Sequence, residues 1–180
     1  MANSDHLDKL RAGNWNESRA HNPELAPDLI DAHLVGMDLR GLDLSKAHLR
    51  GANLSGARLD GADLSRASLD AVDLAEASLT GAVLDHVQFD FLDLTGLDLS
   101  GASLQGATFR GSNLSRANLR RANLSRATLD SAIFDHADLT GANLRVASLR
   151  GARFASATLR GIEADSAIME GVEFEDLDRE

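Results

Sequence analysis

The sequence predicts an all-β solenoid whose coils have four sides and 20 positions each, preceded by a short α-helical cap. Three observations predict this fold class. From Leu29 to Phe174 every fifth residue is apolar, at 30 successive positions without an insertion. Two positions before these central residues, alanine occurs 20 times out of 30, and 14 of the 15 glycines lie two positions after a central residue. Such a regular repeat indicates a chain built from one small unit that stacks on itself.

The five-residue period excludes an α-helix or a straight strand as the repeating element. On a helix five residues advance by about 140°, which scatters the leucines over every side. On a straight strand an odd spacing places successive leucines on opposite faces. A chain that bends after every unit can direct each central residue inward, with alanine at the crowded corner and glycine or a polar residue in the bend. Polar residues beside the central position can then hydrogen-bond to the backbone of the corner.

Bulky side chains and charges predict the number of sides. The intervals between successive central phenylalanines are 20, 25, 20 and 20 positions. Steps of 20 positions from Arg50 also meet charges that nearly alternate in sign, as stacked neighbours prefer. The sequence therefore predicts about seven coils over residues 27–176. The core residues that we single out are the following: Leu49, Leu69, Phe89, Phe109, Leu119, Leu129, Phe134, Phe154 and Phe174.

The repeat units resemble those of a known family. Units such as Ala-Asn-Leu-Ser-Gly (52–56) and Ala-Asp-Leu-Ser-Arg (62–66) are similar to the tandem A(D/N)LXX motif of pentapeptide-repeat proteins, and the resemblance covers roughly residues 27–176. It implies a right-handed quadrilateral β-helix. Some members of that family bind bacterial DNA gyrase by imitating the shape and charge of duplex DNA, and so protect the enzyme from quinolones. The resemblance therefore also implies gyrase as a candidate partner.

Residues 1–26 lack the repeat and predict a helical cap on the first coil. Ser4 is a suitable N-cap residue, and Leu7, Leu10 and Trp15 form the apolar side of the helix. Gly13 predicts that the helix is short or broken. Covering the open end of a solenoid is the usual role of such a segment. A disordered tail is the alternative.

The C-terminal end of the repeat is acidic around Phe174. We expect residues 177–180 to form an acidic tail, because negative charge at an open edge discourages end-to-end stacking. No C-terminal helix is predicted to cover Phe174, so docking of a second subunit there is the alternative. The protein is expected to be a monomer or a homodimer through its C-terminal coil.

The segment 83–99 departs from the repeat. Val87, Leu92 and Leu97 replace alanine at three successive corners, and Phe91 stands where glycine is usual, on the outward side. One interpretation is a locally wider coil or a kink. The other is an exposed apolar contact for a partner.

No motif for catalysis or for cofactor binding is present in the sequence. The chain has no cysteine, its six histidines show no H-E-x-x-H spacing, and its serines show no G-x-S-x-G motif. We therefore expect a protein that is not an enzyme and has no cofactor or metal. The lack of an export signal and of an apolar run of about 18 residues predicts a cytoplasmic protein without membrane contact.

Charge is unevenly distributed along the chain. The net charge is −10, and residues 60–98 carry −8 whereas residues 99–160 carry +6. Cross-coil ion pairs such as Asp90–Arg110–Asp130 are one explanation, and a partner-binding surface is the other. Direct binding of nucleic acid by the arginines is disfavoured by the acidic flanks. The candidate partner-binding residues are Asp70, Asp73, Glu76, Asp90, Phe91, Asp93, Arg116, Arg120, Arg121 and Arg126.

These observations favour a rigid, non-catalytic scaffold that binds a protein partner. The alternative is a DNA-mimicking gyrase binder that protects against quinolones or other gyrase poisons.

Overall fold

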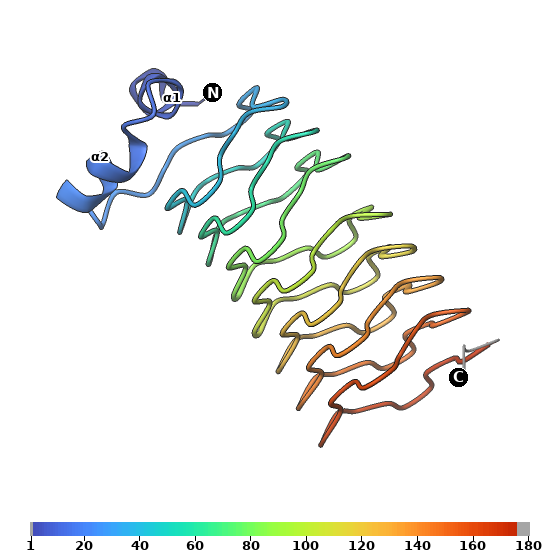
Figure 1. Ribbon diagram of the computed structural model, residues 1–180. Coiled ribbons are helices and arrows are strands. Elements are labelled where there is room, and N and C mark those ends of the chain that lie inside the picture. Colours follow the sequence, from blue (N-terminus) through green and yellow to red (C-terminus); the bar gives the residue numbers. More distant parts are fainter. Residues whose placement is uncertain (1, 176–180) are drawn as a thin grey trace.

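The structure is a computed structural model that describes residues 2–175, which form two short helices followed by a solenoid (Figure 1). Helix α1 spans Ser4–Arg11 and helix α2 spans Trp15–His21. From Asp28 to Glu173 the described chain has no longer strand, and isolated parallel β-bridges join neighbouring coils. The expected acidic tail at 177–180 lies outside the described residues.

Every bridge joins two residues that are 20 positions apart. Asp28 pairs with His48, which in turn pairs with Ser68. Bridge positions follow one another along the chain at five-residue steps, and we number the resulting sides of the coil by them. Face 1 contains residues 28, 48, 68 and so on in steps of 20, and faces 2, 3 and 4 begin with residues 33, 38 and 43. This is the pairing interval that the spacing of the phenylalanines predicts.

The corners between faces are formed by left-handed backbone. Each residue two positions after a central residue has positive φ, from Asp31 (58°) to Gly171 (68°). Glycine adopts this conformation without strain, which explains its position in the repeat. Polar residues before the central position hold the corner, as predicted. Asn53 Oδ1, for example, accepts a hydrogen bond from the Ser55 N–H at 2.9 Å.

Val146 occupies one of these corners with φ 61°. A β-branched residue is poorly suited to left-handed backbone, and the penalty is roughly 1–2 kcal/mol. We expect Val146→Gly to raise the free energy of unfolding by about 1 kcal/mol, because the relief exceeds the extra chain entropy of glycine. Denaturant unfolding of both proteins measures the change. Val146→Ala is the matched control, and equal stability of the glycine and alanine variants would contradict this explanation.

The central residues form a continuous apolar interior. Leu49, Leu119 and Leu129 are fully buried, and Leu69 nearly so. The rings of Phe89 and Phe109 stack with their centroids 4.8 Å apart. Phe134 stacks on Phe154 at the same distance, and Phe154 stacks on Phe174 at 5.7 Å.

Phe174 differs from the expectation that it belongs to the buried core. Its side chain is 47% exposed. The physical reason is its place in the last described coil, where Phe154 covers one side of the ring and no later described coil covers the other.

The helices pack on the first coil. Trp15 is fully buried and its indole Nε1 donates a hydrogen bond to the Asp43 carbonyl at 2.7 Å. Leu10 is buried and Leu7 is partly buried against the same core. The N-cap of α1 is Asn3 and not Ser4, because the Asn3 side chain accepts hydrogen bonds from the N–H groups of residues 5 and 6.

The ladder of hydrogen bonds is interrupted at one boundary, between the coil 67–86 and the coil 87–106, which we call the seam. On face 1 the bridge between Ser68 and Gln88 is absent, and on face 2 the bridge between Asp73 and Asp93 is absent. Every other boundary from 28 to 173 has the bridge at each face. Figure 1 shows the wider gap between the green and yellow-green coils. The departure at 83–99 is therefore a local opening of the coil stack.

Candidate partner-binding surface

The acidic candidate residues lie together along the seam. Asp70 and Asp90 belong to face 1, Asp73 and Asp93 belong to face 2, and Phe91 forms the corner between these faces. Glu76 forms the corner at the far side of face 2. We call these six residues the acidic seam surface. Its two halves come from the two coils that the seam separates.

Phe91 is the most exposed large apolar side chain of residues 2–175, at 81%. Its backbone is left-handed, with φ 60°. The ring reaches over the corner of the next coil, since a Cβ atom at Gly111 would lie 2.9 Å from Phe91 Cδ1. The exposed ring is thus held against a glycine that leaves room for it.

The carboxylates of the surface are mostly free of cationic partners. Asp90 accepts a hydrogen bond from the Arg110 N–H at 2.8 Å and lies 3.4 Å from the Arg110 guanidinium. Asp73 and Asp93 accept hydrogen bonds from backbone N–H groups two residues later. Asp70 accepts one from the Ser68 hydroxyl at 3.0 Å. The surface is therefore strongly negative around an apolar ring.

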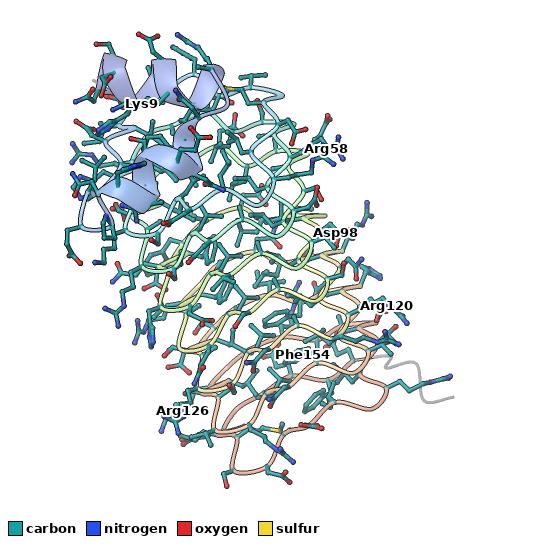
Figure 2. All side chains as sticks on the ribbon, turned by 60° about the vertical axis from the view of Figure 1, so that its left-hand side comes forward. Lys9, Arg58, Asp98, Arg120, Arg126 and Phe154 are labelled. Atoms are coloured by element: carbon teal, nitrogen blue, oxygen red, sulfur yellow. The ribbon has the colours of Figure 1, made fainter. Side chains whose placement is uncertain are left out.

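The candidate arginines do not form a single patch. Arg116, Arg121 and Arg126 are three successive corners of one coil, so a different face separates each pair. Figure 2 shows Arg120 and Arg126 on opposite sides of the solenoid. Only Arg120 and Arg121 adjoin, at an open hollow of about 430 Å³. The predicted basic band is thus spread around the coil.

Arg120 is engaged in a pair within the solenoid. Its guanidinium lies 2.8 Å from Asp138 on the next coil. Burial acts to raise the pKa of Asp138, but hydrogen bonds from Thr140 and Arg120 outweigh it, and the pKa lies below its ordinary value. The cross-coil explanation of the charges therefore holds for this pair and for Asp90–Arg110. The expected link from Arg110 to Asp130 is replaced by contacts of Asp130 with Ser148 and the Arg150 N–H.

A second apolar region lies at the C-terminal end. A hollow of about 200 Å³ is lined only by apolar residues, among them Phe154, Met169 and Phe174. Ile168 and Met169 are also exposed there. The sequence pointed to this end through Phe174, but it did not reveal the hollow, because the side chains that line it are up to 30 positions apart along the chain.

Residues 2–175 contain neither a cluster of metal-ligating side chains nor a helix suited to a membrane. No group of three or more histidine, aspartate or glutamate side chains is arranged to hold a metal ion. Neither of the two helices has the length and apolar character that crossing a lipid bilayer requires.

Comparison with known proteins identifies the repeat. The family described as "Pentapeptide repeats" matches in 8 copies, over residues 28–66, 62–101, 98–135, 107–145 and 132–171. No curated protein sequence matches the chain. Among solved structures, HetL, a pentapeptide repeat protein involved in heterocyst differentiation regulation in Nostoc sp. strain PCC 7120, is 36% identical. The match covers 79% of this chain and 68% of HetL, with a TM-score of 0.36.

A second similar structure is QnrB1, a plasmid-mediated fluoroquinolone resistance protein. It is 20% identical, and the match covers 82% of this chain and 84% of QnrB1 with a TM-score of 0.49. A pentapeptide repeat protein from the thylakoid lumen of Arabidopsis thaliana is 24% identical over 69% of this chain and 66% of its own, with a TM-score of 0.30. With the family match extending over residues 28–171, the chain belongs to the pentapeptide repeat family.

Proposed function

We propose that the protein is a non-catalytic scaffold that binds a protein partner through the acidic seam surface. One observation carries this proposal: Phe91 is 81% exposed and forms the corner between two faces that carry aspartates on both sides of the seam. Aromatic side chains commonly dominate the energetics of interfaces. Surrounding negative charge favours a basic partner and increases the rate of encounter.

A comparison of two single variants tests this proposal. The wild-type protein and Phe91→Ser are used side by side to capture partners. Each captured partner is then purified, and its Kd is measured for the wild type and for Phe91→Ser. We expect Phe91→Ser to weaken binding by roughly tenfold or more, the effect of removing an interface hot spot. Val35→Ser is the matched control, because Val35 is 58% exposed on face 2 but lies far from the seam. Equal Kd values for wild type and Phe91→Ser would overturn the proposal.

Gyrase binding is a second candidate function. Its support is the net charge of −10 and the gathering of carboxylates on faces 1 and 2, together with family membership. Supercoiling by gyrase, with and without a quinolone, tests it directly. Charge reversal of Asp73, Glu76 and Asp93 should then weaken the effect more than reversal of Arg116 and Arg121. Absence of inhibition, protection and complex at micromolar protein would remove this candidate.

We also propose that the solenoid is a right-handed quadrilateral helix of about seven coils, and that it is a monomer or a homodimer through its C-terminal coil. The apolar hollow beside Phe174 supports the dimer. The mass in solution from light scattering distinguishes the two states. A monomer at all concentrations would remove the dimer.

A further inference from the structure

The missing hydrogen bonds at the seam coincide with the three bulky residues Val87, Leu92 and Leu97, which replace alanine in the repeat. At other boundaries the residue after the alanine position donates a backbone hydrogen bond to the preceding coil, as Ser68 N–H does to the Ala47 carbonyl at 2.9 Å. The residues after Val87, Leu92 and Leu97 do not. The following bonds are absent there: Gln88 to Ala67, Asp93 to Val72 and Asp98 to Ala77.

The hydrogen bonds in the opposite direction, from the coil 67–86 to the coil 87–106, are absent on faces 1 and 2 as well. Leu69 and Ala71 do not donate to the coil below on face 1, and Leu74 and Glu76 do not donate on face 2. At all other boundaries between residues 28 and 175 the corresponding bonds are formed.

A single bulky residue at the alanine position does not open the ladder elsewhere, since the residues after Val72, Ile162 and Val172 keep their bonds. At the seam three successive alanine positions are bulky, and Leu92 stands opposite Val72 of the preceding coil. Close packing leaves no room for these added side-chain atoms, so the two coils are held apart.

Charge acts in the same direction as packing. Asp70 is followed by Asp90 in one column of face 1, and Asp73 is followed by Asp93 in the equivalent column of face 2. Stacked like charges destabilise neighbouring strands unless a counter-charge is present, as Arg19 is for Asp43 in the intact Asp43–Asp63 stack. At the next boundary the column changes sign, where Asp90 meets Arg110, and the ladder is intact.

The core is slightly opened along the seam. Leu74 is 6% exposed, whereas the equivalent Leu54 of the preceding coil is fully buried. A hollow of about 210 Å³ reaches Leu69, with Asp70 and Gln88 on its two sides. The two coils therefore share less buried contact on faces 1 and 2 than other neighbours do.

Face 4 keeps its hydrogen bonds across the seam and face 3 loses only the bond from Asp98 to Ala77, so these two faces hold the two coils together. Leu79 N–H donates to the Asp98 carbonyl at 3.0 Å, and Leu84 N–H donates to the Ser103 carbonyl at 2.7 Å. We propose that these two faces form a hinge, so that the solenoid consists of two rigid segments, residues 2–86 and 87–175, whose seam opens and closes on faces 1 and 2. Regions with few buried contacts and unpaired backbone groups are where local opening is easiest.

The hinge passes through the acidic seam surface. Asp70, Asp73 and Glu76 belong to one segment, whereas Asp90, Phe91 and Asp93 belong to the other. A partner that contacts both halves would select one hinge position, a consequence that rests on the proposed function. The hinge itself does not depend on a partner and is tested on the protein alone.

Amide hydrogen exchange, resolved by NMR on the full chain, tests the hinge. The amides of Leu69, Ala71, Leu74 and Glu76 should exchange faster than the equivalent amides one coil earlier, at Leu49, Gly51, Leu54 and Gly56. We expect a ratio on the order of tenfold or more after correction for intrinsic rates, since these groups lack a hydrogen bond and face a local opening. Equal protection of the two sets would overturn the proposal.

A triple variant tests the cause. Val87→Ala, Leu92→Ala and Leu97→Ala together restore the repeat, and we expect exchange at Leu69, Ala71, Leu74 and Glu76 to slow toward the rate of their counterparts. Leu92→Ala alone should act in the same direction if the triple variant does not fold. Leu119→Ala serves as the matched control, because it removes a core side chain one coil away from the seam. Unchanged or faster exchange at the seam in Leu92→Ala would overturn the proposed role of the corner residues.

Discussion

Leu119→Ala is expected to lower the free energy of unfolding by about 2–5 kcal/mol, through lost apolar burial and the cavity that remains. Leu119 is fully buried at a central position on face 3. Its own N–H donates to the Asp138 carbonyl at 2.8 Å, so the coils on either side hold the backbone in place and limit collapse into the cavity. Equilibrium unfolding in urea, followed by far-UV circular dichroism, gives the change.

The exposed Arg50 provides a control for Leu119. Arg50→Ala removes a longer side chain from the outside of face 1, and surface substitutions of this kind usually change stability by no more than about 0.5 kcal/mol. A loss for Leu119→Ala as small as that for Arg50→Ala would mean that the central residues do not line the interior.

Arg19→Met is expected to release the N-terminal cap. The Arg19 side chain is only 3% exposed and connects α2 to the first coil. Its guanidinium lies 3.1 Å from Asp43 Oδ2, donates to Ser45 Oγ at 3.0 Å, and bonds to the carbonyls of Pro23 and Leu25. Breaking a buried pair on one side costs about 3–5 kcal/mol, although the partial exposure of Asp43 reduces the effect here.

The single tryptophan reports on the cap. Trp15 is fully buried between the helices and the first coil, so its emission shifts to longer wavelength when the cap leaves. In Arg19→Met we expect this shift at a lower denaturant concentration than the loss of the solenoid. Arg11→Met, on the exposed side of α1, is the control. An unchanged midpoint for Trp15 emission in Arg19→Met would contradict the role of Arg19.

The same contact makes the cap sensitive to acid. Burial acts to raise the pKa of Asp43, but hydrogen bonds from Ser45 and Arg19 outweigh it and lower the pKa. A group with a lowered folded-state pKa contributes stability that is present above its unfolded pKa, about 4, and is lost as the pH falls through the folded value. The denaturant concentration at the midpoint of the Trp15 emission change should therefore decrease as the pH is lowered below 4 in the wild type. The decrease should be smaller in Arg19→Met.

The repeat could be predicted from the sequence because one physical requirement recurs in every unit. A leucine that must be buried, an alanine at a tight corner and a glycine at left-handed backbone leave few alternatives, and the pairing of positions 20 apart follows from the phenylalanines. The cap residues Leu10 and Trp15 could be predicted for the same reason, since an apolar end must be covered. Arg19 was not, because a buried arginine has no sequence pattern that separates it from exposed ones.

The candidate site was only partly predictable. Val87, Leu92 and Leu97 indicated a disturbed coil, but whether the coil widens or separates depends on packing against the coil above. The arginines at 116, 121 and 126 are close along the chain and distant in space, because a step of five leads around a corner whereas a step of 20 leads to the neighbour. Asp73 and Asp93, by contrast, are 20 positions apart along the chain but occupy equivalent positions on neighbouring coils.

An electron-density map of the crystallised protein tests the central claim most directly. It should show the rings of Phe134 and Phe154 stacked inside the solenoid, residues paired at intervals of 20, and a gap between Ser68 and Gln88 and between Asp73 and Asp93. Phenylalanine rings directed to solvent, or a ladder that is continuous across residues 68–95, would contradict it.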